Sequence, residues 1–268
     1  MSIARIGDVE INYEVFGDKG PAVLLVMGLG TRGDSWSPIS RALAGAGYRA
    51  IQFDNRDVGA SSVLTTDYTV ADMAADAIGL LDHLGIDRAH LIGISMGGMI
   101  AQEILLRAPG RFDRAVLIAT SPGGRQAKMA APELLGALLA MGGDGTAGVE
   151  GLRALYQAIT APGFADAHPE LIEMSVAFAL ENPVTREGLM RQIGAIGRFS
   201  TWERLPGVNV PTLVVHGDAD PLIPYENGVI LSQRIPGAKL RTLPGVGHLV
   251  PLEAPAETFG AITAFFGS

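Results

Sequence analysis

The stretch from residue 89 to 107 predicts a strand, a sharp turn and a helix in direct succession. Residues 89–94 form an apolar run typical of a strand, and a helix is expected from about residue 96 onward. Between them, residues 93–97 read Gly-Ile-Ser-Met-Gly and match the pattern G-x-S-x-G. Glycines two residues before and after Ser95 remove the Cβ atoms that would collide in such a turn. The Ser95 hydroxyl is therefore expected to project from the end of a strand, out of a sheet.

Strand-like and helical segments alternate on both sides of this stretch. Continuous apolar runs of strand length suit strands that are buried on both faces, and a β-α-β order implies a parallel sheet with helices on both faces. Residues 3–16 predict two further short strands around a turn at residues 7–8. The other expected strands are 22–26, 48–53, 115–119, 210–216 and 238–243, and the other expected helices of this part are 36–46, 70–84, 225–234 and 255–266. The sequence therefore predicts an α/β fold.

Residues 126–199 differ from this rhythm because they carry only helical patterns, with glycine and proline at the joints. Helices are expected at 132–141, 149–159, 168–180 and 183–196. We interpret this part as an inserted helical cap, which gives a core of residues 1–121 and 203–268 and a cap of residues 122–202. The methionine and leucine side chains of the cap either line an apolar pocket or pack the cap onto the core.

The composition excludes several classes of protein. The chain has no cysteine, which rules out disulfides, cysteine-bound zinc and a thiol nucleophile. Its net charge is −8 and its Lys and Arg residues are scattered, so no nucleic-acid partner is expected. No apolar run approaches the ~20 residues of a membrane span, and the N-terminus lacks a signal-peptide pattern, so we expect a cytoplasmic protein. No metal or organic cofactor is suggested, and the oligomeric state cannot be read from the sequence.

Partners for a serine nucleophile lie at other predicted strand ends. A serine needs a base, the base needs an orienting acid, and side chains at the carboxyl ends of parallel strands meet at one edge. His248 follows the last predicted strand in a glycine-rich loop, whereas His216 precedes a tight turn and is expected to be structural. Asp220 lies at a loop tip from which it can reach His248, whereas Asp218 is expected to make the turn with its own side chain. We therefore predict a Ser95, Asp220 and His248 triad.

These motifs resemble the α/β-hydrolase superfamily over essentially the whole chain. The matching segments are residues 93–98, residues 216–224 (His-Gly-Asp-Ala-Asp-Pro-Leu-Ile-Pro) and residues 245–248 (Gly-Val-Gly-His). Residues 54–61 also resemble the D-x-R-G-x-G-x-S segment of the family, in a loop expected to buttress the site, but Asp57 replaces the usual glycine. The resemblance implies a mostly parallel eight-stranded sheet, with Ser95 as nucleophile, His248 as base and then acid, and Asp220 as the residue that orients it.

The resemblance also implies where the substrate carbonyl oxygen is held. The backbone N–H of Met96 opens a helix, where unsatisfied donors favour an oxyanion, and the family pattern adds the N–H of Leu29. Met27 stands where many members have histidine, which makes the expected pocket floor more apolar. Met27 and Trp36 are therefore expected to contact the substrate. Further candidate pocket walls are Met96 and, in the cap, Met174 and Phe178.

The function implied is that of a carboxylic-ester hydrolase that forms an acyl-enzyme on small or medium apolar esters. The alternative is a lactonase acting on an acyl-homoserine lactone or an enol-lactone, because residues 95–99 also resemble enol-lactonases. A cofactor-free perhydrolase shares the same triad, and a non-catalytic ligand receptor can keep it. Haloalkane dehalogenases and most epoxide hydrolases of this fold need aspartate in place of the serine of the G-x-S-x-G turn, so Ser95 excludes their mechanisms.

Overall fold

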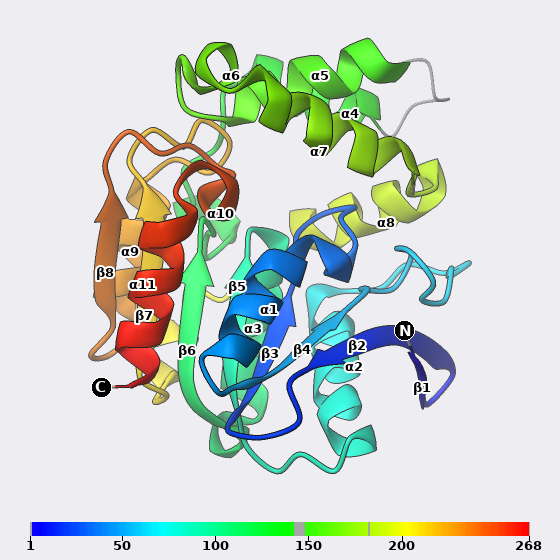
Figure 1. Cartoon of the computed structure of the whole chain (residues 1–268), viewed down its shortest axis with the longest axis vertical. Helices are drawn as coiled ribbons and strands as arrows, with labels where there is room; N and C mark the ends of the chain where they lie inside the picture. Colours follow the sequence, from blue (N-terminus) through cyan, green and yellow to red (C-terminus); the bar gives the residue numbers. More distant parts are fainter. Residues whose placement is uncertain (1, 142–147, 182, 268) are drawn as a thin grey trace.

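The computed structural model describes residues 2–141, 148–181 and 183–267 (Figure 1). In these residues an eight-stranded sheet has the strand order β1-β2-β4-β3-β5-β6-β7-β8. Strands β1 and β2 pair antiparallel, as do β2 and β4, and every neighbouring pair from β4 to β8 is parallel. The bounds are β1 Ser2–Ile6, β2 Val9–Phe16, β3 Ala22–Val26, β4 Arg49–Phe53, β5 Ala89–Ile94, β6 Phe112–Ile118, β7 Thr212–Gly217 and β8 Lys239–Leu243. The predicted α/β fold with a mostly parallel sheet is confirmed.

Helices cover both faces of the sheet. Neighbouring residues of a strand point to opposite sides, and the buried strands have apolar side chains on both. On one face, Leu24 and Leu91 pack in a cluster with α2 (Val70–His83) and α3 (Met96–Arg107). On the other face, Val23 and Ile92 pack in a cluster with α1 (Ser37–Gly45) and α11 (Pro255–Phe266). Helix α9 (Glu226–Arg234) adds Leu231 to the first cluster. Both faces are therefore closed, and functional groups are confined to the strand ends.

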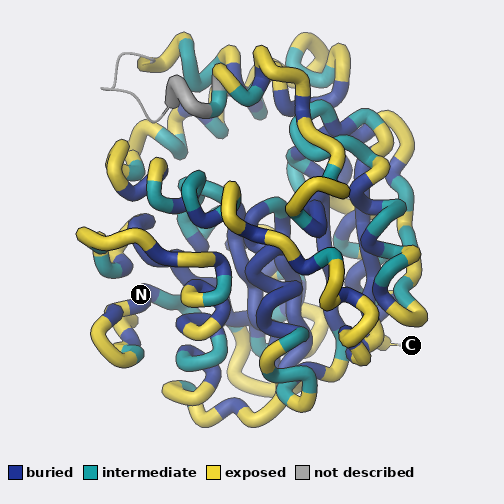
Figure 2. Tube along the Cα trace, turned by 180° about the vertical axis from the view of Figure 1, so that it is seen from behind, coloured by how far each residue is buried: buried dark blue, intermediate teal, exposed yellow. Residues whose placement is uncertain are grey.

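The helices between β6 and β7 lie beyond the carboxyl edge of the sheet (Figure 1). They are α4 (Pro132–Met141), α5 (Gly148–Ile159), α6 (Phe164–Ala167), α7 (Pro169–Glu181) and α8 (Arg186–Gly197). Four match the helices expected from the sequence to within a few residues, and the short α6 was not expected. Figure 2 shows that burial is concentrated in the strands and the helices against them, whereas the cap segments carry more exposed residues. The division into a core and a cap at residues 121 and 203 stays a prediction.

Two local signals explain where helices α2 and α8 begin. The Thr69 side chain accepts a hydrogen bond from the Asp72 N–H, and the Asp72 carboxylate accepts one from the Thr69 N–H, so a capping box starts α2. Helix α8 starts similarly, with the Thr185 hydroxyl accepting a hydrogen bond from the Gly188 N–H. In the described part of the chain, no helix combines the length and apolar character needed to cross a membrane.

Candidate active site

The serine of the G-x-S-x-G pattern lies in the turn between β5 and α3. Ser95 has φ 55° and ψ −122°, a conformation that non-glycine residues rarely adopt and that recurs at functional sites. The surroundings hold it there. The Ser95 N–H donates to the Ile118 carbonyl at 2.9 Å, and the Thr120 hydroxyl donates to the Ser95 carbonyl at 2.7 Å. Strand β6 and the residues that follow it therefore fix the serine backbone.

The flanking glycines are required by close backbone approaches. A Cβ atom on Gly93 would collide with the carbonyl of Gly97, and a Cβ on Gly97 would collide with the carbonyl of Val26 at the end of β3. The turn is thus pressed against the next strand of the sheet. This explains in physical terms why the sequence has glycine at both positions.

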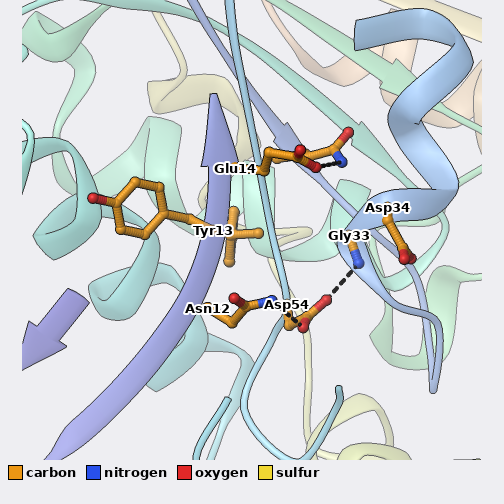
Figure 3. A pocket seen from close by; sticks show the side chains of 8 residues that line it. Asn12, Tyr13, Glu14, Gly33, Asp34 and Asp54 are labelled. Carbon is orange, nitrogen blue, oxygen red and sulfur yellow. Dashed lines mark hydrogen bonds between the residues drawn. The ribbon is translucent and has the colours of Figure 1, made fainter. Parts of the chain in front are cut away.

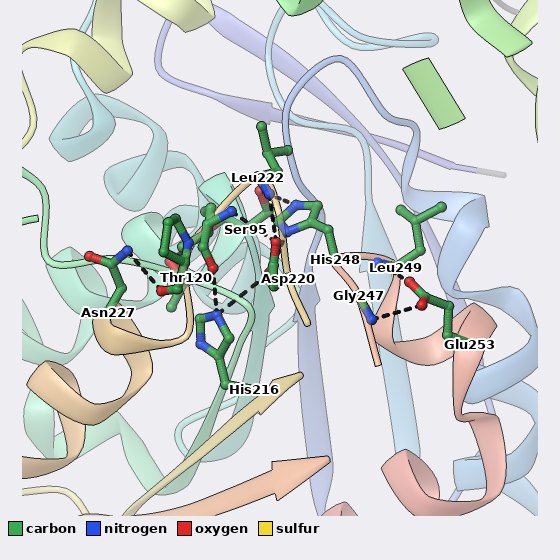
Figure 4. Close-up of polar contacts among 12 residues, drawn as sticks. Ser95, Thr120, His216, Asp220, Leu222, Asn227, Gly247, His248, Leu249 and Glu253 are labelled. Atoms are coloured by element: carbon green, nitrogen blue, oxygen red, sulfur yellow. Dashed lines mark hydrogen bonds and ion pairs between the residues drawn. The ribbon is translucent and has the colours of Figure 1, made fainter. Parts of the chain in front are cut away.

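The structure brings the three predicted residues together. The Nε2 atom of His248 lies 3.1 Å from the Oγ atom of Ser95, and its Nδ1 atom lies 2.9 Å from the Oδ2 atom of Asp220 (Figure 4). The side chains of Asp220 and His248 are 0% and 6% exposed. Because the carboxylate accepts the Nδ1 proton, neutral His248 presents the lone pair of Nε2 to Ser95. The arrangement is suited to withdrawing a proton from the serine hydroxyl.

The loop after β7 holds Asp220 in its ionised form. Its Oδ1 atom accepts hydrogen bonds from the N–H groups of Leu222 and Ile223 at 2.9 and 2.8 Å. Burial raises the pKa of Asp220, but the charge of protonated His248, together with hydrogen bonds from His216, His248 and the Ile223 N–H, outweighs burial and lowers the pKa to about 2. The carboxylate therefore remains negative at neutral pH.

The neighbouring polar residues of this loop support it from two sides. His216 is fully buried, and its Nε2 atom lies 2.8 Å from the Ile223 carbonyl and 3.5 Å from Oδ2 of Asp220, as suits the structural position expected for it. Asp218 differs from its expectation. Its Oδ1 atom accepts a hydrogen bond from the Gly245 N–H at 2.6 Å, so it ties the aspartate loop to the histidine loop instead of closing its own turn.

Glu253, which sequence reasoning missed, organises the loop that carries His248. Its carboxylate accepts hydrogen bonds from the N–H groups of Gly247 and Leu249 at 2.7 and 3.0 Å (Figure 4). It also accepts one from the N–H of Ala161 at 2.9 Å. It lies at the end of the short helix α10 (Val250–Glu253). The His248 N–H also donates to the carbonyl of Ile159 in the cap at 2.9 Å. A lone carboxylate in the otherwise apolar residues 249–256 was the available signal.

The loop of residues 54–61 supports the glycine-rich loop of residues 27–33, which directly follows β3. The carboxylate of Asp54 accepts hydrogen bonds from the Gly33 N–H and the Asn12 amide, both at 2.8 Å, at a small pocket (Figure 3). The Asn55 amide donates to the Met27 carbonyl at 2.9 Å. These contacts are consistent with the buttress expected from the sequence.

The structure explains why Asp57 can stand where the family pattern has glycine. It has φ 68°, a left-handed conformation in which glycine is favoured and aspartate is tolerated. Its fully buried carboxylate accepts two hydrogen bonds of 2.9 Å from Arg191 on α8. Burial raises the pKa of Asp57, but hydrogen bonds from Arg191 and the Leu64 N–H outweigh it, so the pKa is lowered. The aspartate thus links this loop to the cap.

The two predicted oxyanion donors belong to a helix and a loop that both adjoin Ser95. The Met96 N–H is the first of α3, where N–H groups have no partner within the helix. Leu29 follows Gly28, at which a Cβ atom would lie 3.2 Å from the Cβ atom of Ser95, so this loop passes beside the nucleophile. The assignment of both donors stays a prediction.

The predicted pocket walls differ in how much surface they offer. Met27 is 9% exposed and Trp36 is 1% exposed, and both belong to the apolar cluster with α1 and α11. The indole of Trp36 therefore packs as a core side chain and offers almost no surface to a ligand in this conformation. In the cap, Met174 is 55% exposed, and Phe178 is half-buried with the Arg32 guanidinium 5.8 Å from its ring centre. Substrate contact by these residues stays a prediction.

Charged side chains around the site are largely paired. Arg56 and Asp76 make two hydrogen bonds of 2.7 Å, and Arg32 pairs with Asp34. Within residues 2–141, 148–181 and 183–267, no group of three or more His, Cys, Asp or Glu side chains is placed to hold a metal ion. The groups placed for chemistry are a hydroxyl, an imidazole and a carboxylate.

A parallel sheet with a serine at this turn, and with acid and histidine on later strand ends, defines the α/β-hydrolase class. A family model for the α/β hydrolase fold matches residues 21–255, so the chain belongs to this family of hydrolases. The resemblance expected from the motifs is thereby confirmed.

Known relatives include enzymes with several substrates. A putative carbamate hydrolase, RutD, of Variovorax paradoxus is 32% identical over 243 residues, which cover 89% of each chain. The crystal structure of an enol-lactonase from Burkholderia xenovorans has a TM-score of 0.87 and 25% identity, with full coverage of both chains. A thermophilic esterase from Thermogutta terrifontis has a TM-score of 0.81 and 27% identity over 98% of this chain and 95% of its own.

Proposed function

We propose that this protein is a carboxylic-ester hydrolase that works through an acyl-enzyme on Ser95. The observation that carries the proposal is the chain of contacts from Ser95 Oγ to His248 Nε2 (3.1 Å) and from His248 Nδ1 to Asp220 Oδ2 (2.9 Å). A hydroxyl, a base and a buried acid in this order are the parts that acyl transfer requires.

The reaction begins when His248 Nε2 takes the proton of Ser95 and Oγ attacks the ester carbonyl carbon. The N–H groups of Leu29 and Met96 bind the oxyanion that forms, and a donor of this kind typically contributes on the order of 10²–10³ in rate. His248 then gives its proton to the leaving alcohol, which leaves an acyl group on Ser95. In the second half, His248 takes a proton from water while the water oxygen attacks the acyl carbon. It returns this proton to Ser95 Oγ as the bond between Oγ and the acyl carbon breaks and the acid is released.

Asp220 has two roles in this cycle. It keeps the Nδ1 proton on His248, so that the Nε2 lone pair faces Ser95, and its negative charge stabilises the imidazolium present between proton transfers. The pKa of about 2 supports this role, because the Asp220 carboxylate stays charged at neutral pH. No metal or organic cofactor takes part in the proposed reaction.

The proposed substrate class follows from the residue at the start of the loop beside Ser95 and from the relatives. Met27 is an apolar residue at the start of the loop beside Ser95, which favours small or medium apolar esters. A lactonase is the second candidate, since an enol-lactonase structure is similar over the whole chain and the chemistry differs only in a tethered leaving alcohol. The carbamate hydrolase relative adds carbamates to the substrates to be compared.

A matched substrate panel tests the proposal. Ethyl pentanoate, δ-valerolactone and an ethyl carbamate are offered to the wild-type enzyme, and each kcat/KM is divided by the uncatalysed rate constant. We expect the open-chain ester to exceed the lactone by at least about tenfold on this scale, with many turnovers per enzyme. A tenfold preference for the lactone would assign a lactonase instead. A single slow turnover with every substrate would indicate a ligand receptor.

A further inference from the structure

One of the side chains by which the cap contacts the glycine-rich loop is Gln192 on α8, which is fully buried. Its Oε1 atom accepts a hydrogen bond from the Gly30 N–H at 2.8 Å, and its Nε2 atom donates to the Arg56 carbonyl at 3.0 Å. The residue is 0% exposed. Both ends of this amide are therefore used, and both partners belong to loops of the core.

A second buried amide holds the same loop from its other end. The Asn55 amide, on a residue that is 1% exposed, donates to the Met27 carbonyl at 2.9 Å. The two amides thus hold the carbonyl of Met27 and the N–H of Gly30. The residues between these two points are Gly28, which lies beside Ser95, and Leu29.

Helix α8 also packs directly on the end of this loop. Gly30 has φ 62°, and a Cβ atom there would lie 3.1 Å from the Cδ1 atom of Leu189, one turn before Gln192 on the same helix. Contacts from α8 in the cap therefore help to set the conformation of the loop at Gly30.

We propose that Gln192 is a positioning residue, which fixes the Leu29 N–H for the oxyanion by holding the N–H of the next residue. The inference rests on the proposed function and extends it, because it makes a cap side chain part of the support for the transition state. Gln192 itself touches neither substrate nor Ser95 in this account. A small displacement of an oriented group lowers the rate of the chemical step more than it lowers substrate binding.

The test compares two buried glutamines. Gln192→Met removes both hydrogen bonds at similar length. The matched control is Gln52→Met, because Gln52 is 2% exposed and also uses both ends of its amide. Its Oε1 atom accepts a hydrogen bond from the Ser40 hydroxyl at 2.7 Å, and its Nε2 atom donates to the side chains of Ser37 and Glu14 at 3.0 and 3.2 Å, on α1 and β2. We expect Gln192→Met to lower kcat for a short ester by about 10- to 100-fold with KM within about threefold. The control is expected to keep kcat within about threefold.

A second readout does not depend on ester turnover. Amide hydrogen exchange of Gly30, measured by NMR, should become faster in Gln192→Met and stay unchanged in Gln52→Met. Gln192→Asn, whose amide is one methylene too short to reach Gly30, provides a milder variant if the methionine variant does not fold. It should lower kcat in the same sense, by about tenfold.

Three results overturn the inference: unchanged exchange of Gly30, a Gln192→Asn enzyme with kcat within twofold of wild type, or an equal loss of kcat in Gln52→Met. Failure of the proposed function has a different signature, because Ser95→Ala would then retain ester turnover while the Gly30 exchange result stood.

Discussion

Replacing Ser95 with alanine is expected to lower kcat for a short p-nitrophenyl ester by about 10⁴-fold or more. The reason is that, among the described residues, Ser95 provides the only hydroxyl within hydrogen-bond distance of His248 Nε2. The two atoms lie 3.1 Å apart. The protein should remain folded, with a melting temperature close to that of wild type, because alanine keeps the Cβ atom and removes only the oxygen. Steady-state kinetics and thermal unfolding measure the two effects.

Ser175→Ala is the matched control, because the Ser175 hydroxyl donates only to the Leu171 carbonyl of its own helix at 2.9 Å. This variant should turn over the ester at the wild-type rate. Wild-type turnover by Ser95→Ala would show that another group carries the reaction.

Replacing Asp220 with asparagine is expected to lower kcat by about 10⁴-fold, the loss seen when a serine hydrolase triad loses its acid charge. Asparagine can still accept the hydrogen bonds of Leu222 and Ile223, so the loop should keep its shape. It cannot stabilise the imidazolium, and its amide favours the wrong tautomer of His248. The control is Asp218→Asn, because exposed Asp218 binds the Gly245 N–H and not His248. A greater loss of kcat in Asp218→Asn would reverse the choice between the two acids.

The lowered pKa of Asp220 also predicts how the stability of the folded protein depends on pH. The pKa of Asp220 is lowered from 3.8 to about 2, so its carboxylate stabilises the folded state above pH ~4 and this contribution is lost as the pH falls toward 2. The contribution at neutral pH is on the order of 2 kcal/mol. Urea unfolding should therefore separate wild type from Asp220→Asn by more at pH 7 than at pH 3. An equal difference at both pH values would contradict the assigned shift.

The core of this fold could be predicted because its signals are local. Strand β3 is a continuous apolar run and is buried at every position. Helix α3 spans Met96–Arg107, as expected after the G-x-S-x-G turn. The short helices α6 and α10 were missed because four residues cannot display a helical period. The predicted triad residues meet because all three follow strands of one parallel sheet, so their chain order and topology were sufficient.

The supporting contacts could not be predicted because they join distant parts of the chain. Gln192 is 162 residues from Gly30, and α8 showed only an ordinary helical pattern. Glu253 acts on backbone N–H groups, which leave no trace in the identity of the residues that donate them. Asp57 was recognised as a departure from the family pattern, but its partner Arg191 lies in the cap, whose placement the sequence does not specify.

Covalent trapping tests the central claim most directly. The wild-type enzyme is treated with diethyl p-nitrophenyl phosphate, which phosphorylates an activated serine to give an ester that hydrolyses slowly. The labelled enzyme is then digested with trypsin for mass spectrometry. The account predicts one diethyl phosphate per chain, on Ser95 within the tryptic peptide of residues 89–107, with esterase activity lost in proportion to labelling. Complete inactivation with the label on another residue, or complete labelling of Ser95 with activity retained, would contradict it.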